Sequence, residues 1–161
     1  MKIVDGSKYL EQVKDLIVEY TQFLNRDLSF QNLEAELNDL KSKYTGNHGR
    51  ILVAVTDDNQ VVGCVAFYRH DQNRCEMKRL YVRPQYRNQK IASKLVSNII
   101  KEAKNCGYQE MVLDTIKPLK AAISLYQQFG FQKTQPYYHN PMDDVLYFKL
   151  SLNGGENDGI I

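Results

Sequence analysis

Cysteine is scarce in this chain of 161 residues, and its spacing excludes two classes of small protein. The three cysteines, Cys64, Cys75 and Cys106, are odd in number and form no Cys-x-x-Cys pair, and the histidines do not cluster. The pattern predicts neither a disulfide framework nor a zinc site. Buried free thiols in a reducing compartment are the simpler interpretation, which indicates a cytoplasmic protein.

Long apolar runs and an excess of charge of one sign are also missing. No stretch approaches the roughly 20 apolar residues that cross a bilayer, and the first residues contain no apolar segment of the signal-peptide type. The formal net charge is +2, from 21 Lys and Arg against 19 Asp and Glu. So small a charge provides no general attraction to nucleic acid or to membranes.

The organisation of the chain is typical of one globular domain. We find no internal repeat, linker or low-complexity block, and the length suffices for a proper core. Residues 1–152 are expected to form a single domain, and the polar, glycine-rich residues 153–161 a flexible C-terminal tail.

Hydrophobic periodicity predicts a strand and two helices in the first third of the chain. Residues 2–5 form the expected strand, and the apolar residues between 10 and 24 follow helical spacing, with Ser7 as the N-cap. A second helix, capped by Ser29, carries an apolar stripe that ends at Tyr44.

The rest of the chain predicts a meander of strands followed by alternating helices and strands. Each of the two later helices ends at a glycine, Gly107 or Gly130, with an aromatic residue directly after it, which is typical of a left-handed C-cap. Pro118 is placed to open the second of them. The strands expected in this region are 51–55, 61–68, 75–82, 111–113 and 145–150.

Together these elements predict an α/β fold, in the α+β sense of a mixed sheet. Most of the sheet is expected to be antiparallel, with helices on both faces. Residues 75–113 are expected to form a parallel strand–helix–strand crossover of right-handed sense. In an open sheet of this type a ligand binds where strand ends meet helix N-termini.

Residues 80–92 bring such a corner together with positive charge. The segment runs from a strand through a tight polar turn into a helix, whose first amides have no internal partner and carry about half a positive charge. A phosphate-bearing ligand would meet backbone and cationic donors together there. On charge alone, a solvated basic surface is the simpler interpretation. The cations around the turn are Arg83, Arg87, Lys90 and Lys94.

Two ordered motifs in this part of the chain resemble those of the GNAT superfamily of N-acetyltransferases. The first, residues 76–92, is similar to the strand and [R/Q]-x-x-G-x-[G/A] loop with which that family cradles the pyrophosphate of acetyl-CoA. The second, residues 121–131, is similar to the family's A-x-x-L-Y-x-x-x-G-F helix. Their order and the elements between them are more specific than either motif alone.

The resemblance implies a GNAT-like fold and an enzyme that moves an acetyl group from acetyl-CoA, as co-substrate, to a primary amine of a small molecule or peptide. The amine would attack the thioester directly. Backbone amides near Leu80 and Val82 would polarise the thioester carbonyl, freed by a bulge in their strand. The cofactor-binding residues that the resemblance implies are Leu80, Tyr81, Val82, Arg87, Asn88, Gln89, Lys90, Ile91, Ala92, Ser93, Ala122 and Tyr126.

The sequence departs from the family pattern at three positions. Lys90 stands where the family usually has glycine, and Asn88 replaces another frequent glycine. If the position of Lys90 requires a positive φ, lysine is strained there; if it does not, the ammonium group adds a cation beside the phosphates. Leu119 replaces an asparagine that holds the cofactor in many members, so that contact is expected to be absent.

Two side chains would carry the chemistry that the resemblance implies. Tyr126 matches the family's general acid, which protonates the departing thiolate, and a phenol with a pKa near 10 stays protonated at neutral pH. Glu76 matches the carboxylate that takes a proton from the amine, often through water. On the residues alone, Tyr126 is more simply a core tyrosine, and Glu76 is equally the partner of Lys78 or of a cation on a neighbouring strand.

The aromatic segment 136–141 is expected to contact the acceptor. Tyr138 and His139 are its candidate substrate-binding residues, because some small-molecule acetyltransferases carry a similar run, although simple loop packing also explains it. His48 and His70 lie in predicted turns and are expected to have no catalytic role.

Two other classes of function stay open on the residues. A non-catalytic acyl-CoA-binding module would keep the loop but would not need Tyr126. A nucleic-acid-binding domain built on the basic residues between 78 and 94 would bind oligonucleotides in a salt-sensitive way, but the net charge of +2 disfavours it. We expect no nucleic-acid, membrane or metal partner; edge strands in such folds often pair, which leaves a homodimer open.

Overall fold

The structure is a computed structural model, and it describes residues 1–27 and 32–152. The chain divides into two compact units. Unit 1 contains Met1–Tyr68 and Lys78–Ile99, and unit 2 contains Arg69–Met77 and the residues from Ile100 onward. The predicted Ser29 cap and the C-terminal tail lie outside the described residues.

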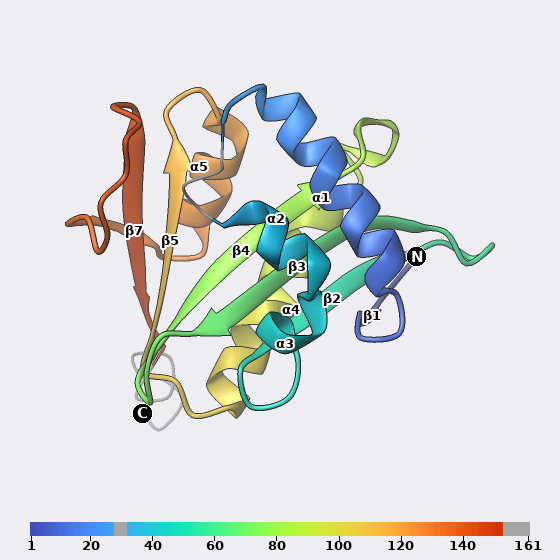
Figure 1. The fold of residues 1–161 in the computed structure, drawn as a ribbon, viewed down its shortest axis with the longest axis horizontal. Coiled ribbons are helices and arrows are strands. Elements are labelled where there is room, and N and C mark those ends of the chain that lie inside the picture. Colours follow the sequence, from blue (N-terminus) through green and yellow to red (C-terminus); the bar gives the residue numbers. More distant parts are fainter. Residues whose placement is uncertain (28–31, 153–161) are drawn as a thin grey trace. The chain divides into compact units, whose positions relative to one another are not determined.

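The strands of the described residues form a mixed seven-stranded sheet in the order β1-β2-β3-β4-β5-β7-β6 (Figure 1). β4 and β5 pair in parallel, whereas β1–β2, β2–β3, β5–β7 and β6–β7 are antiparallel. The predicted mixed, mostly antiparallel sheet with one parallel crossover is confirmed. The strands are β1 (Lys2–Asp5), β2 (Gly49–Val55), β3 (Val61–Arg69), β4 (Arg74–Val82), β5 (Glu110–Ile116), β6 (Gln132–Thr134) and β7 (Val145–Ser151).

The helices are α1 (Leu10–Leu24), α2 (Leu33–Asn38), α3 (Leu40–Tyr44), α4 (Ile91–Asn105) and α5 (Lys120–Gln128). The predicted second helix is two short ones, because the backbone leaves the helical region at Asp39, whose side chain instead caps α3 by accepting from Ser42 N at 3.2 Å. The predicted Ser7 cap of α1 is wrong: Ser7 N donates to Asp5 Oδ1 at 2.7 Å, and the N-cap is Tyr9. Among these described helices, none is long and apolar enough to cross a membrane.

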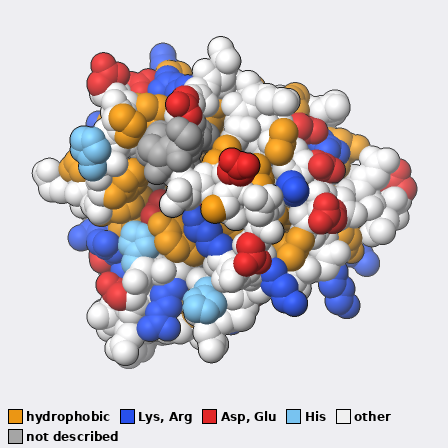
Figure 2. Space-filling view, in the orientation of Figure 1, with side chains coloured by type: hydrophobic (Ala, Val, Ile, Leu, Met, Phe, Trp, Pro, Cys, Tyr) orange, Lys and Arg blue, Asp and Glu red, His pale blue; other side chains and the backbone are white. Residues whose placement is uncertain are grey.

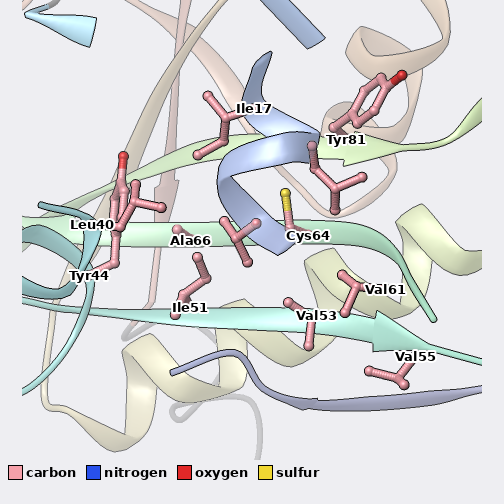
Figure 3. Close-up of a cluster of buried hydrophobic side chains, with 12 residues drawn as sticks. Ile17, Leu40, Tyr44, Ile51, Val53, Val55, Val61, Cys64, Ala66 and Tyr81 are labelled. Carbon is pink, nitrogen blue, oxygen red and sulfur yellow. The ribbon is translucent and has the colours of Figure 1, made fainter. Parts of the chain in front are cut away.

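The core of unit 1 fills both faces of its strands. On one face, α1 and α3 pack against alternate residues of β2, such as Ile51 and Val53, and against β3 (Figure 3). On the other face, a Cβ built on Gly63 of β3 would lie 3.3 Å from Leu95 Cδ1 of α4. This close approach of strand and helix is available to glycine because it lacks a side chain.

Arg79 interrupts the regular backbone of β4 in unit 1. Its φ is 64°, the left-handed conformation that a non-glycine residue adopts at a cost of about 1–2 kcal/mol. Its guanidinium is held by Glu36 of α2 through two bonds, Nε to Oε2 at 2.7 Å and Nη2 to Oε1 at 2.9 Å. Lys43 Nζ adds a third contact to Oε1 at 2.8 Å. The left-handed residue Arg79 is thus held by a buried ion pair, and the predicted bulge that frees the amides near Leu80 and Val82 stays a prediction.

Unit 2 contains the antiparallel pair β5–β7, with the short strand β6 at its edge. The end of α5 follows the predicted glycine cap: Gly130 has a φ of 97° and donates to Gln127 O at 3.0 Å, and Phe131 N donates to Tyr126 O at 3.1 Å. The Phe131 ring returns onto the Tyr126 ring with a centroid distance of 5.9 Å. This Schellman-type end fixes Tyr126 in the last turn of the helix.

We expect the Glu36–Arg79 pair to make the free energy of unfolding sensitive to acid. Burial opposes ionisation of Glu36, but the hydrogen bonds and charge of Arg79, followed by Lys43, outweigh it and lower its pKa to about 2. The unfolded value is about 4.3, so the stabilisation is complete above about pH 5 and is lost as the pH falls through the folded value.

Urea denaturation of the wild type, Glu36→Gln and the exposed control Glu34→Gln from pH 2 to pH 7 measures this effect. At pH 7 Glu36→Gln should lower the free energy of unfolding by roughly 3 kcal/mol, because Arg79 stays buried without its charged partner. The difference should narrow below pH 4, while Glu34→Gln changes little at any pH. A difference that is independent of pH would contradict the lowered pKa.

Candidate functional site

The turn between β4 and α4 presents backbone donors at the N-terminus of a 15-residue helix, whose residues up to Ile99 belong to unit 1. β4 ends at Val82, and a 3-10 turn, η2 (Pro84–Tyr86), redirects the chain. The first helical bond of α4 runs from Lys94 N to Lys90 O at 3.1 Å. The amides that precede this bond have no acceptor within the helix and form a site suited to an anion. They belong to Lys90, Ile91, Ala92 and Ser93.

Two residues of this loop adopt the left-handed conformation. The φ of Asn88 is 66° and that of Lys90 is 63°. Lys90 stands where the GNAT superfamily usually has glycine. This position does adopt a positive φ, so the lysine is strained there. Asparagine accepts this geometry more readily than lysine does. Residues 87–90, which include the predicted Gln89, are exposed.

The predicted cations around the loop differ in their surroundings. Arg83 pairs with Glu19 of α1, Nη2 to Oε1 at 3.0 Å, so its charge is largely satisfied within unit 1. Arg87 donates from Nε to Val82 O at 3.2 Å, and its guanidinium lies 5.3 Å from the ring centroid of Phe23. Lys90 and Lys94 are exposed. The positive charge available to an anion therefore comes mainly from Arg87 and the two lysines.

The face of the molecule shown in Figure 2 has no large surface area of one charge sign. In Figure 2 acidic and basic side chains are interspersed, as the small net charge implies. An anion would therefore be attracted by the local geometry of the loop and not by a general basic surface.

Glu76 of β4 belongs to unit 2, and its carboxylate is buried. Its side chain is 3% exposed, and Oε1 lies 2.8 Å from His70 Nε2. His70 Nδ1 in turn accepts a hydrogen bond from Arg74 Nε at 3.0 Å. One partner of Glu76 is thus a histidine from the turn that precedes β4, which the sequence did not suggest.

Tyr138 lies in the same unit, in a short polar network. Its hydroxyl donates to Asp114 Oδ2 of β5 and accepts from Asn140 Nδ2 at 2.7 Å. Burial, and then the charge of Asp114, raise the pKa of Tyr138 well above its usual range. The side chain is therefore a neutral hydrogen-bonding group. His139, predicted beside it, is exposed.

A cluster of aromatic rings joins these groups within unit 2. The Tyr137 ring lies 5.4 Å from that of Tyr138, 5.3 Å from that of Tyr147 and 5.7 Å from that of His70. The Tyr137 hydroxyl is buried and has no hydrogen-bond partner in the described residues. Burial, and then the charges of Glu76 and Asp114, raise its pKa.

Sequence reasoning missed Arg74, Asp114 and Tyr147, and it expected no catalytic role for His70. Tyr137 was predicted only as part of the aromatic segment 136–141. The positions of these residues in the sequence do not show that they lie close together, because their contacts arise from tertiary structure. Only the short turn between β3 and β4 hints that His70 returns toward Glu76.

The predicted site residues divide between the two units. The loop set from Leu80 to Ser93 lies in unit 1, with Tyr81 and Ile91 buried. Tyr126, which is 7% exposed, and the half-buried Ala122 lie on α5 in unit 2. Unit 2 also holds Glu76, Tyr138 and His139. The predicted loop residues thus fall in unit 1, and the predicted acid, base and substrate-binding residues fall in unit 2.

Comparison with known proteins gives one consistent result. The sequence model of the acetyltransferase (GNAT) family matches residues 10–131. An uncharacterized N-acetyltransferase of Schizosaccharomyces pombe is 44% identical over 145 residues, which cover 89% of each chain.

Solved structures agree with this result. A GNAT-family acetyltransferase from Staphylococcus aureus Mu50 superposes with a TM-score of 0.79 at 22% identity, covering 94% of this chain and 98% of its own. A GNAT-family acetyltransferase from Elizabethkingia anophelis, solved with acetyl-CoA bound, superposes with a TM-score of 0.57 at 25% identity, covering 72% of this chain and 82% of its own.

The left-handed backbone of Lys90 generates a test by paired substitution. Lys90→Gly and Lys90→Ala remove the same charge, but only glycine removes the steric cost of a φ of 63°. We expect Lys90→Gly to be more stable than Lys90→Ala by about 1 kcal/mol. Urea denaturation of both variants measures the difference, and equal stabilities would show that this position is not strained.

Proposed function

The chain belongs to the acetyltransferase (GNAT) family, and from this premise we propose that it transfers the acetyl group of acetyl-CoA to a primary amine. The observation that carries the proposal is the loop between β4 and α4, where unpaired helix amides meet exposed cations. The acetyl-CoA bound to the Elizabethkingia anophelis relative supports the choice of cosubstrate.

The pyrophosphate of acetyl-CoA is the anion proposed for the loop. The amides of Lys90 to Ser93 donate to its oxygens, and the guanidinium of Arg87 adds charge. Asn88 and Gln89 line the same turn. The pantetheine arm then follows β4, where the backbone of Leu80, Tyr81 and Val82 comes directly after the left-handed Arg79.

The proposed reaction is direct transfer without a covalent enzyme intermediate. Glu76 takes a proton from the ammonium form of the acceptor, directly or through a water, and the neutral amine attacks the thioester carbonyl carbon. The carbon–sulfur bond breaks, and Tyr126 protonates the departing thiolate. The new amide nitrogen then loses its surplus proton, which replaces the proton that Tyr126 gave, and Glu76 releases the ammonium proton to solvent.

The acceptor is proposed to be a small molecule or peptide that reaches the aromatic cluster of unit 2. Tyr138 is fixed by Asp114 and presents a neutral, amphipathic surface, and the exposed His139 adds a polar group beside it. A non-catalytic acyl-CoA-binding module is not favoured, because it has no need of a tyrosine at position 126 or of a buried carboxylate at position 76.

Tyr126→Phe tests the general acid. It removes only the hydroxyl, so binding of acetyl-CoA should be nearly intact, whereas kcat should fall by roughly 100-fold. The assay follows release of CoA thiol and the mass of acetylated product over a panel of primary amines. Tyr9→Phe, at the N-cap of α1 in unit 1, is the matched control. Unchanged turnover in Tyr126→Phe would remove Tyr126 from the chemistry.

Glu76→Gln tests the base. The loss of turnover should be greatest at low pH, where the acceptor is an ammonium ion that must lose a proton before it can attack. Glu110→Gln, on β5 of the same unit, serves as the control and should keep the wild-type profile. The same fractional loss at every pH would assign Glu76 a structural role only.

A further inference from the structure

Three polar side chains of unit 2 form a directed chain that ends on Glu76. Arg74 Nε lies 3.0 Å from His70 Nδ1, and His70 Nε2 lies 2.8 Å from Glu76 Oε1. Only 15% of the His70 side chain and 3% of the Glu76 side chain are exposed. The contacts are therefore shielded from competing water.

The chemistry of Arg74 decides the protonation of the histidine. A guanidinium always carries its Nε proton and accepts no hydrogen bond, so His70 Nδ1 must be the acceptor. A neutral imidazole whose Nδ1 has no proton carries its proton on Nε2. His70 therefore donates to Glu76 Oε1, and a second ring proton on Nδ1 would be directed at the Arg74 N–H.

The turn between β3 and β4 holds this arrangement in place. Asp71 Oδ1 accepts from the backbone N–H groups of Asn73 at 2.7 Å and Arg74 at 2.9 Å, and His70 N donates to Arg74 O at 2.9 Å. The Tyr137 ring covers both side chains, 5.7 Å from the His70 ring and 5.6 Å from Arg74 Cζ. Backbone and ring packing thus align the two donors before any substrate binds.

We propose that His70, locked as the Nε2–H tautomer by Arg74, is a positioning residue that orients the Glu76 carboxylate and stabilises its ionised form. The inference rests on the proposed function for the role of Glu76 as the base. Because its Nδ1 is occupied, His70 does not relay the proton that Glu76 takes up; it holds the carboxylate for that uptake.

Two phenols and one thiol of unit 2 that interact with Glu76 have pKa values raised above their usual ranges, so they carry no charge where a carboxyl titrates. Burial raises the pKa of Tyr137, of Tyr147 and of the Cys75 thiol, and the charge of Glu76 raises each of them further. The charge of Asp114 also raises the pKa of Tyr137 and of Tyr147. Arg74 carries a fixed positive charge.

Two substitutions separate the two hydrogen bonds of His70. His70→Gln places an amide N–H near the position of Nε2 and keeps a donor for Glu76, whereas His70→Asn places an amide oxygen near Nδ1 and keeps only the acceptor for Arg74. The readout is the carbon-13 titration of the Glu76 carboxyl in protein labelled at glutamate, assigned by the signal that Glu76→Gln removes. It requires no turnover.

We expect the titration midpoint of Glu76 to rise by about one pH unit in His70→Asn and to stay near the wild-type value in His70→Gln, because a hydrogen bond to the carboxylate favours its charged form. The acid limb of kcat/KM should move by the same amount. Equal midpoints in wild type and His70→Asn, or equal shifts in both variants, would overturn the inference.

Failure of the proposed function gives a different result. If the carboxyl titration moves in His70→Asn while the acid limb of kcat/KM does not, His70 positions Glu76 but Glu76 is not the base. Nitrogen-15 spectra of the wild-type histidines provide a further check that needs no variant. They should show His70 protonated at Nε2 and bare at Nδ1 near pH 8, and the opposite tautomer would overturn the inference.

Discussion

The buried ion pair between Glu36 and Arg79 is the constraint on which the geometry of β4 depends. Arg79 stands in the left-handed region, and its guanidinium is clamped by Glu36 and thereby tied to α2. Residues before it in β4 include Glu76, and residues after it lead to the loop at α4. A buried pair of this kind adds little net stability compared with apolar packing, but breaking it is costly, so it specifies one backbone conformation.

Strain recurs where the proposed cosubstrate would lie. Arg79, Asn88 and Lys90 have φ values of 64°, 66° and 63°, and none of them is a glycine. A residue with a side chain keeps a left-handed backbone only where the surrounding contacts hold it there. Such residues cluster at functional sites. These three residues lie on one continuous stretch, from the middle of β4 to the residue before α4, which is the stretch proposed to bind acetyl-CoA; the other left-handed non-glycine residues described are asparagines elsewhere in the chain, Asn25, Asn32 and Asn59.

The fold was largely predictable from the sequence because its signals are local. Apolar periodicity and the two glycine–aromatic helix ends placed most elements, and the strand–helix–strand order of residues 75–113 predicted the parallel crossover. The break at Asp39 was missed because a capping aspartate inside an apolar stripe resembles an exposed helical residue, and β6 is too short to show a period. The network around Glu76 was beyond local reasoning: Asp114 and Tyr147 are opposite each other only through the pairing of β5 with β7, and His70 reaches Glu76 only through the turn between β3 and β4. The sequence predicted strain at Lys90 only if its position requires a positive φ. The backbone conformation was needed to decide whether it does.

Calorimetric titration of the purified protein with acetyl-CoA tests the central claim most directly. Desulfo-CoA is the control for the thioester, and ATP is the control for an adenine nucleotide without pantetheine. The account predicts saturable binding of acetyl-CoA and weaker binding of ATP, since the loop and β4 together recognise pyrophosphate and pantetheine. Absence of binding at millimolar acetyl-CoA would contradict it, and would mean that the lysine in place of glycine has closed the site that defines the family.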